Sequence, residues 1–358
     1  MWKALFYQTP DQPFFKQILI TFPLNLQKEF YNRSHEYFWS DIKEYLKMKI
    51  KVAITGGAGF IGSNLTFALL SRGYAVEILD NFYTGSKKNL NSFKNEPDLT
   101  ITEHDIRTPL DIRADIIINL ACPASPPHYQ KDPIYTWETS VYGISNLLKT
   151  ALKNKAKLLH ASTSEVYGDP LEHPQNESYW GNVNPIGIRS CYDEGKRAAE
   201  TIITDYKRVH NINASIFRIF NTYGPLMQPD DGRVVSNFSL QNLAKKPYTI
   251  YGKGDQTRSF CYVDDLVKGI ILMMEYEKPM DTPVNLGNPH EFTIKQLAEV
   301  IDKETGYINS INYQPLPSDD PVKRKPDIAL AQKILGWNPE VSLQQGIQPT
   351  LAYFKNFI

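Results

Sequence analysis

The sequence predicts an α/β fold, in which a Rossmann-type doubly wound parallel sheet is followed by a smaller, mixed α/β substrate-binding domain. Three observations lead to this prediction. Short apolar segments alternate with longer helical patterns, as in a series of βαβ units. A glycine-rich turn comes directly after the first apolar segment. After residue 222 the sequence pattern changes, and prolines and glycines separate short predicted strands and helices.

Residues 48–222 form the first predicted domain, and its strands are short and largely apolar, which is typical of strands buried on both faces. These strands are predicted at residues 51–54, 76–79, 99–106, 115–121, 157–162 and 214–220. Helices are predicted in the intervals, at residues 60–72, 136–153 and 192–210. Gly73 follows the first helix, in the position where glycine commonly ends a helix. Strands and helices in this order predict a parallel sheet.

Residues 223–358 form the second predicted domain, which we expect to cover the substrate. Strands are predicted at residues 248–251, 284–286 and 311–314, and helices at residues 263–276, 293–304 and 327–335. Residues 1–47 are rich in aromatic and charged side chains and form an N-terminal extension of unknown role. Two interpretations of this extension stay open. It is either an addition ahead of a domain that begins at Met48, or an arm that binds a partner.

The composition argues against several classes of protein. The 39 basic and 39 acidic residues leave no net charge, so neither nucleic acid nor an anionic membrane is an expected partner. Cys122, Cys191 and Cys261 lie far apart without metal-ligand spacing, so neither a disulfide scaffold nor a metal site is expected. The most apolar early stretch, residues 18–24, is too short to span a bilayer and does not follow the order of a secretory signal. We therefore expect a cytoplasmic protein.

The glycine-rich turn carries Gly56, Gly59 and Gly62, a spacing variant of the dinucleotide-binding fingerprint. Glycine there permits a tight turn, close approach to a pyrophosphate and close packing of helix on strand. Asp80 ends the second strand, where a carboxylate accepts hydrogen bonds from a ribose 2′-hydroxyl and repels a 2′-phosphate. The pattern therefore indicates NAD rather than NADP. The alternatives are a glycine turn without a ligand and a strand-end turn residue at Asp80.

Polar residues also end the third and fifth strands, and such strand ends line the crevice in this fold. Asp105 is a candidate to accept from an adenine amino group, or else it caps a turn. Thr163 is a candidate to hold a substrate hydroxyl. Glu165 is a candidate for acid–base chemistry, or else it only positions substrate or water.

Tyr192 and Lys196 have Tyr-x-x-x-Lys spacing, which places both side chains on one face of a helix. Beside an oxidised nicotinamide, the ammonium group lowers the phenol pKa, so that the phenolate can take a proton from a substrate hydroxyl. The spacing alone is common in long chains. Its position downstream of the glycine-rich turn makes it a candidate active site.

Several basic side chains are candidates to bind an anionic substrate, because guanidinium groups match the geometry of a diphosphate. For each of them, a solvated surface position is the alternative. These candidates are Arg189, Arg233, Arg258, Lys323 and Arg324. Tyr251 is a candidate to pack against a nucleobase, or else it fills the core.

Six longer segments add a more specific signal. They are Leu120-Ala-Cys-Pro-Ala-Ser-Pro126, Ser162-Thr-Ser-Glu-Val-Tyr-Gly-Asp-Pro-Leu-Glu-His-Pro174, Tyr179-Trp-Gly-Asn-Val-Asn-Pro-Ile-Gly187, Arg189-Ser-Cys-Tyr-Asp-Glu-Gly-Lys-Arg197, Asp230-Asp-Gly-Arg-Val-Val-Ser-Asn-Phe238 and Lys323-Arg-Lys-Pro-Asp327. With the glycine turn, they resemble the extended short-chain dehydrogenase/reductase family over residues 50–355. Within that family they resemble the UDP-glucuronate decarboxylases.

The resemblance implies roles at the matching positions. The implied catalytic residues are Thr163, Glu165, Tyr192, Lys196 and Arg258. The implied NAD-binding residues are Gly56, Gly59, Phe60, Ile61, Gly62, Asp80, Asn81, Phe82, Thr84, Gly85, Asp105, Ile106, Leu120, Tyr192 and Lys196. The implied UDP-glucuronate-binding residues are Asn221, Arg233, Val235, Asn237, Phe238, Tyr251, Arg258 and Arg324. We also expect a homodimer.

The reaction implied by the resemblance is NAD-dependent decarboxylation of UDP-glucuronate to UDP-xylose. Tyr192 takes the proton of the C4 hydroxyl while a hydride passes from C4 to NAD. The carboxylate of the resulting 4-keto sugar acid then leaves as carbon dioxide, and Thr163 and Tyr192 stabilise the enolate. Reprotonation at C5 and return of the hydride to C4 complete the cycle.

Two positions favour different reactions. Ser164 stands where related nucleotide-sugar 4,6-dehydratases carry an acid that helps to expel water from C6, so Ser164 favours decarboxylation. Glu138 stands where the decarboxylases carry a lysine, and its charge would repel a glucuronate carboxylate that such a lysine holds. A 4,6-dehydratase or a 4-epimerase is therefore an alternative. A non-catalytic NAD-binding protein is a second one, although it would not need Thr163, Tyr192 and Lys196 together.

Overall fold

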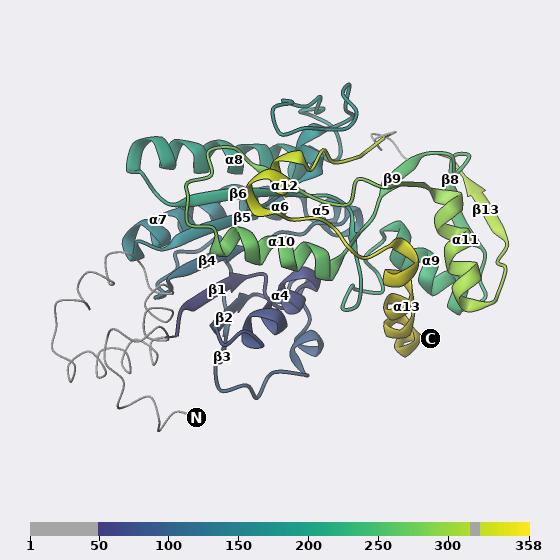
Figure 1. Cartoon of the computed structure of the whole chain (residues 1–358), viewed down its shortest axis with the longest axis horizontal. Coiled ribbons are helices and arrows are strands. Elements are labelled where there is room, and N and C mark those ends of the chain that lie inside the picture. The colour runs from purple at the N-terminus through teal and green to yellow at the C-terminus, as the bar shows by residue number, and fades with distance from the viewer. Residues whose placement is uncertain (1–48, 316–322) are drawn as a thin grey trace, which may run out of the picture. The chain divides into compact units, whose positions relative to one another are not determined.

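The computed structural model describes residues 49–315 and 323–358, and residues 51–358 form one compact unit (Figure 1). The predicted extension of residues 1–47 lies outside the described residues. Within the described part of the chain, no helix is both long and apolar enough to cross a membrane.

A parallel sheet forms the centre of the unit, as predicted (Figure 1). Its strands are β1 (Lys51–Thr55), β2 (Ala75–Asp80), β3 (Leu99–Glu103), β4 (Ile116–Asn119), β5 (Lys157–Thr163), β6 (Ala214–Ile219) and β11 (Val284–Leu286). In space they run in the order β11-β6-β5-β4-β1-β2-β3. The chain thus starts in the middle and winds outward in both directions, which opens a crevice where β1 and β4 lie side by side.

Alternate residues of β1, at the centre of the sheet, belong to hydrophobic cores on opposite faces of the sheet. On one face, Ile54 belongs to the core formed with α4 (Phe60–Leu70) and α10 (Val263–Glu275). On the other face, Ala53 belongs to the core formed with α7 (Ile144–Asn154) and α8 (Ser190–His210). This burial on both faces explains why the strands read as apolar runs rather than as alternating patterns.

The helix predicted at residues 136–153 is longer and interrupted. It consists of α6 (Pro133–Glu138), the π-helical segment η3 (Thr139–Gly143) and α7. It begins earlier than predicted because the Asp132 carboxylate accepts from the Tyr135 N–H at 2.9 Å and Pro133 occupies the first helical position. A short helix, α5 (Pro126–Lys131), precedes it and was not predicted. Within residues 49–315 and 323–358, the 3-10 segments are η2 (Lys87–Leu90), η4 (Ser164–Tyr167) and η5 (Lys355–Phe357).

The C-terminal part of the chain contributes a smaller group of helices and strands beside the central sheet (Figure 1). It contains three two-stranded pairs, β7 (Thr222–Tyr223) with β10 (Cys261–Tyr262), β8 (Tyr248–Tyr251) with β13 (Ile311–Gln314), and β9 (Thr257–Ser259) with β12 (Glu291–Thr293). The helices α9 (Val234–Leu243), α11 (Ile294–Thr305) and α13 (Leu343–Phe354) pack on one another there, and α12 (Ala329–Leu335) lies against α10 and β11.

One strand of this C-terminal part lies elsewhere than expected. The segment 284–286 was predicted for the smaller domain, but β11 pairs with β6 at the edge of the central sheet. All three of its residues are buried, as in an additional parallel strand, and the side chain of Asn285 donates to the carbonyls of Gln175 and Asp327. The strand predicted at residues 99–106 ends at Glu103, so Asp105 lies in the turn that follows. The division of roles between residues 48–222 and 223–358 stays a prediction.

Candidate active site

A cavity of about 590 Å³ lies along the carboxyl ends of the central strands, where this fold places its ligands. Gly56 after β1, Asp80 at the end of β2 and Thr163 at the end of β5 all line it. Of the residues that the family resemblance implies, only Phe82 is not part of this lining. Its backbone N–H donates to Asp80, and the ammonium group of Lys87 lies over its ring. The cavity therefore brings the candidates together, while their individual roles stay predictions.

The glycine turn has the close packing that a pyrophosphate site needs. Gly56 has a φ of +73°, and a Cβ there would lie 2.8 Å from the backbone of Leu120 and Ala121. A Cβ on Gly62 would lie 2.2 Å from the carbonyl oxygen of Gly56, so α4 approaches the turn this closely only with glycine. No side chain caps α4 after Gly59, which leaves its first N–H groups to a phosphate. These residues fit a dinucleotide.

The carboxylate of Asp80 links the glycine turn to the end of β2 through hydrogen bonds to backbone N–H groups. Its Oδ2 accepts from the Ala58 N–H at 2.9 Å, and its Oδ1 accepts from the Phe82 N–H at 2.8 Å. Burial raises the pKa of Asp80, and the two backbone hydrogen bonds oppose that rise. A carboxylate has lone pairs beyond these two bonds. The side chain of Asp80 therefore stabilises the turn at the end of β2, as the alternative interpretation proposed. It can also still accept a hydrogen bond from a ribose hydroxyl.

Asp105 lines the cavity next to Asp80 and is held by two neighbours. Its Oδ2 accepts from Asn81 Nδ2 at 3.1 Å and from Arg107 Nη2 at 3.0 Å. Burial favours the neutral acid, but the hydrogen bonds from Arg107 outweigh it and lower the pKa of Asp105 below its ordinary value. Glu138 accepts from the same guanidinium at 2.8 Å and does not line the cavity. Glu138 therefore shares the single guanidinium group of Arg107 with Asp105 and stands outside the cavity lining.

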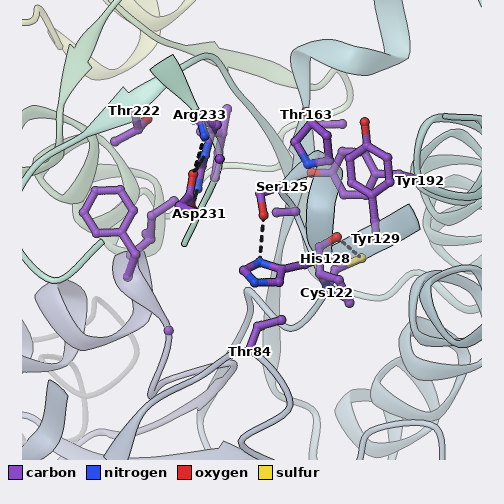
Figure 2. A pocket seen from close by; sticks show the side chains of 18 of the residues that line it. Thr84, Cys122, Ser125, His128, Tyr129, Thr163, Tyr192, Thr222, Asp231 and Arg233 are labelled. Atoms are coloured by element: carbon purple, nitrogen blue, oxygen red, sulfur yellow. Dashed lines mark hydrogen bonds and ion pairs between the residues drawn. The ribbon is translucent and has the colours of Figure 1, made fainter. Parts of the chain in front are cut away.

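Tyr192 and Lys196 lie on one face of α8, as the spacing predicted. The ring of Tyr192 stacks on Tyr129 with centroids 5.1 Å apart and planes at 4°, and Thr163 lines the cavity on the same side (Figure 2). The Nζ of Lys196 lies 5.9 Å from the centroid of the Tyr192 ring and donates to the Ala161 carbonyl at 2.8 Å. Hydroxyl, phenol and ammonium groups thus form one cluster at the end of β5.

Burial dominates the charge states of this cluster in the chain by itself. Burial raises the pKa of Tyr192 and lowers the pKa of Lys196, so both neutral forms are favoured relative to water. The predicted lowering of the phenol pKa applies to a site that also carries the positive charge of an oxidised nicotinamide. It therefore stays a prediction for the complex.

Glu165 is bound by two arginines. Arg189 Nη2 donates to its Oε2 at 2.6 Å, and Arg324 donates to both of its oxygens, through Nη1 to Oε1 and through Nη2 to Oε2 at 2.9 Å. Burial opposes the charge, but the two guanidinium groups outweigh it and hold the pKa of Glu165 at about 2. A carboxyl group with such a pKa is a weak acid–base catalyst near neutral pH. The geometry therefore favours the alternative in which Glu165 positions substrate or water.

Arg233 lies across the cavity from this cluster. Figure 2 shows Asp231 and Arg233 on one side of the pocket and Thr163 and Tyr192 on the other. Asp231 accepts from Arg233 Nε at 2.5 Å and from Nη2 at 2.7 Å. Arg258, in β9, is 8% exposed and donates to the carbonyl of its neighbour Thr257. Guanidinium groups from several elements thus surround the space where an anionic substrate would lie.

Sequence reasoning missed part of the wall formed by α5. Tyr129 supports the Tyr192 ring, and Ser125 Oγ lies 2.7 Å from His128 Nδ1 (Figure 2). Two consecutive prolines open this helix, and proline at the first helical position is a start signal that could have revealed it. Asp231 was also missed, although it lies only two residues before Arg233 in the sequence. In residues 49–315 and 323–358, no three His, Cys, Asp or Glu side chains gather as a metal site.

Known proteins resemble this chain along most of its length. A sequence profile of the GDP-mannose 4,6 dehydratase family matches residues 53–350. UDP-glucuronic acid decarboxylase 4 of Arabidopsis thaliana is 53% identical over 311 residues, which cover 87% of this chain and 70% of that protein. UDP-glucuronic acid decarboxylase 1 of Xenopus tropicalis is 48% identical over 309 residues, covering 86% of this chain and 73% of that protein.

A solved structure has the same fold. It is the UDP-glucuronic acid 4-epimerase from Bacillus cereus in complex with UDP-glucuronic acid and NAD. Its TM-score is 0.79 at 28% identity, and the match covers 86% of this chain and 100% of that one.

Proposed function

The chain belongs to the GDP-mannose 4,6 dehydratase family and, within it, to the UDP-glucuronic acid decarboxylases, and we propose that it converts UDP-glucuronate into UDP-xylose and carbon dioxide. NAD is the cofactor. The observation that carries the proposal is the wall beside Tyr192, where Thr163, Ser164 and Glu165 follow one another at the end of β5. This wall supplies hydroxyl groups at the reacting carbon and a carboxylate that two arginines hold ionised.

The residues of this wall suit proton control at the sugar C4 oxygen. When bound, NAD supplies the oxidation of C4 and its later reversal. Tyr192, which lines the cavity together with Thr163, is placed to accept the hydroxyl proton and later to return it. Loss of carbon dioxide leaves an electron pair in the enolate of the C4 ketone. Thr163 and protonated Tyr192 can donate hydrogen bonds to that enolate oxygen, and C5 then takes up a proton.

The charges along the cavity support an anionic nucleotide sugar as substrate. UDP-glucuronate carries a diphosphate and a carboxylate, and guanidinium groups match both geometries. Arg189, Arg233, Arg258 and Arg324 line the cavity, as does Lys196. The charge of Glu138, which would have opposed a carboxylate, is paired with Arg107 outside this lining. Because Glu138 does not line the cavity, the objection it raised against a glucuronate substrate is weakened, and the product assay tests it.

Ser164 separates the proposal from its nearest rival. A 4,6-dehydratase has to expel water from C6, and an acid between Thr163 and Glu165 would serve that step. This chain has a buried serine there, 2% exposed and part of the cavity wall. Serine is too weak an acid to replace a carboxyl group in that role. A 4-epimerase would leave the carboxylate in place, and only product analysis separates it from a decarboxylase.

The direct test is the product of the full chain incubated with UDP-glucuronate and NAD. We expect one carbon dioxide for each sugar consumed, UDP-xylose as the nucleotide sugar in mass spectra and NMR, and no net NADH. UDP-glucose and dTDP-glucose serve as controls and should not be dehydrated. UDP-galacturonate as the product would establish the epimerase instead, and a 4-keto-6-deoxy sugar from a neutral hexose would establish the dehydratase. A 4-keto pentose with accumulating NADH would show that the cycle stops after decarboxylation.

We further propose that the chain acts as a cytoplasmic homodimer. Supporting the dimer, the consecutive helical segments α6 and η3 expose Ile134, Trp137 and Tyr142 at 71%, 39% and 52%. Trp137 and Tyr142 contact each other edge to face with centroids 5.7 Å apart, so they form one apolar surface that a second copy could cover. Sedimentation of the wild type and of Tyr142→Asp tests the dimer, and cell fractionation tests the location. A monomeric wild type would contradict the proposal.

A further inference from the structure

Glu138 is a charged side chain that the proposed reaction does not use. It ends α6, and its carboxylate accepts from Arg107 Nη1 at 2.8 Å. Neither Glu138 nor Arg107 lines the cavity. Arg107 contacts Asp105 and Tyr135, which do line it. Asn81, which also lines the cavity, is hydrogen-bonded to both of these residues. The pair therefore stands directly behind one end of the cavity wall.

Arg107 is fixed on three sides. Its Nε lies 3.2 Å from both oxygens of Asp105, and its Nη2 lies 3.0 Å from Oδ2, so one edge of the guanidinium group faces that carboxylate. The Cζ atom of its guanidinium group lies 4.2 Å from the centroid of the Tyr135 ring. Glu138 takes the remaining end of the group. A planar cation with such partners has a single favoured orientation, and it transmits that orientation to Asp105.

The same network extends into the turn after β2. Asn81 Nδ2 donates to Asp105 Oδ2 at 3.1 Å and to the Tyr135 hydroxyl at 2.6 Å. The Tyr135 ring lies 4.4 Å, centroid to centroid, from the ring of Tyr83, which also lines the cavity. The ends of β2 and β3 are thus joined to α6 through side chains only. In this fold, the adenosine half of a dinucleotide lies over the ends of these two strands.

We propose that Glu138 is a positioning residue for the cofactor: it orients Arg107, which holds Asp105 and Tyr135 in place around the adenine ring of NAD. The proposal rests on the NAD dependence of the proposed function, but it does not depend on which sugar is the substrate. It also explains why an acidic residue is compatible with an acidic substrate at this position. The charge of Glu138 is used at the adenine end and not at the sugar end.

A competing interpretation is that the pair is an ordinary surface ion pair. The side chains of Arg107 and Glu138 are each 33% exposed, and isolated pairs with such exposure contribute little to folding. The two interpretations predict different measurements. A surface pair affects neither cofactor affinity nor selectivity, whereas a positioning residue changes both while leaving the fold intact.

The test compares the affinities of the full chain for NAD and for its hypoxanthine analogue, in which a carbonyl replaces the adenine amino group. Protein stripped of nucleotide is titrated calorimetrically as wild type, Glu138→Gln and Glu138→Asp. The control is Glu103→Gln, which removes the partner of Lys87 at the end of β3, in a pair whose side chains are 71% and 66% exposed. Thermal unfolding without ligand shows whether each variant is folded, and Glu138→Asp retains the charge if Glu138→Gln does not fold.

We expect Glu138→Gln to raise the Kd for NAD about three- to tenfold, the range of one charge-assisted contact at a partly exposed site. The preference of the wild type for NAD over the hypoxanthine analogue should shrink, because Asp105 is no longer held as an acceptor. Glu138→Asp should lie between, and Glu103→Gln should match the wild type. At saturating NAD, the KM for UDP-glucuronate should not change.

Unchanged NAD affinity and unchanged selectivity in folded Glu138→Gln would overturn the proposal. A raised KM for UDP-glucuronate with normal NAD binding would also overturn it, because Glu138 would then act at the sugar end. If UDP-glucuronate proves not to be a substrate at all, the proposed function fails while the binding comparison still decides the role of Glu138.

Discussion

At the cofactor end of the cavity, the carboxylates of Asp80 and Asp105 bind backbone N–H groups or side chains that are near in the sequence or on adjacent strands. Asp80 takes the N–H groups of Ala58 and Phe82, and Asp105 takes the guanidinium group of Arg107 two residues away. At the sugar end, by contrast, Glu165 is bound by Arg324, which lies 159 residues further along the chain. Asp80 and Asp105 therefore have partners from neighbouring segments, whereas Glu165 has a partner from a segment far away in the sequence.

The difference has a physical consequence. The pairing of β1 with β2 and with β4 holds the backbone around the glycine turn next to Asp80. The carboxylate of Glu165 is held ionised by two guanidinium groups that come from other segments of the chain and lower its pKa. Changes at the sugar end should therefore affect chemistry and stability together, while changes at the cofactor end should mainly affect binding.

The largest effect is expected from Tyr192→Phe, which tests the chemistry of the sugar end alone. The ring and its stacking on Tyr129 are retained, but the ionisable oxygen is lost. Turnover should fall by about 10²–10⁴, the usual contribution of a general acid–base group. Steady-state assays with UDP-glucuronate measure the loss, and calorimetry with UDP should show nearly unchanged binding. Near-normal turnover would contradict the proton-transfer role.

Glu165→Gln tests whether the assembled ion pairs stabilise the fold. A carboxyl group with a pKa near 2 instead of its ordinary 4.5 contributes about 3 kcal/mol to the free energy of unfolding at neutral pH. Since the folded pKa is depressed, this contribution is complete above about pH 5 and is lost as the pH falls toward 2. The variant should be less stable by a similar amount at pH 7.

The measurement is urea unfolding of wild type and Glu165→Gln between pH 7 and pH 3. The difference between the two proteins should shrink as the solution becomes more acidic. The matched control is Glu103→Gln, whose exposed pair with Lys87 should contribute less than about 0.5 kcal/mol. Equal stability of Glu165→Gln and wild type at pH 7 would show that the arginines do not hold the charge as described.

Asp80→Ala tests the cofactor end. Removing the carboxylate leaves the N–H groups of Ala58 and Phe82 without their acceptor and loosens the glycine turn. NAD binding should weaken by about 1–3 kcal/mol, the cost of leaving buried donors unpaired. Calorimetric titration with NAD and with NADP measures the change. Tighter binding of NADP than of NAD by the wild type would contradict the role assigned to Asp80.

The smallest effect is expected from deleting residues 1–47. These residues lie outside the described part of the chain, the first strand begins at Lys51, and the described residues that line the cavity begin at Gly56. A chain that starts at Met48 should fold and bind NAD with a Kd within about twofold of the full chain. Circular dichroism and calorimetry measure both properties. Insoluble protein or lost NAD binding would show that both ends of the cavity depend on the extension.

Much of the fold could be read from local patterns. The strands of the central sheet, the glycine turn and the shared face of Tyr192 and Lys196 were predicted because each depends on a few consecutive residues. The helices α5, α9 and α13 were not predicted. A proline lies inside α13 and two prolines open α5, so neither has the plain periodic pattern on which the prediction relied.

The sequence by itself determined the class of fold and the cofactor, and it predicted the shared helix face of Tyr192 and Lys196, because strand burial, turn geometry and helical spacing are local properties of the chain. Only the tertiary structure decided which charges meet. It placed Arg324 on Glu165 and Arg107 on Glu138, and it moved β11 into the central sheet. The physical reason is that an ion pair or a strand pairing depends on distances between segments that are far apart in the sequence, and no local pattern encodes those distances.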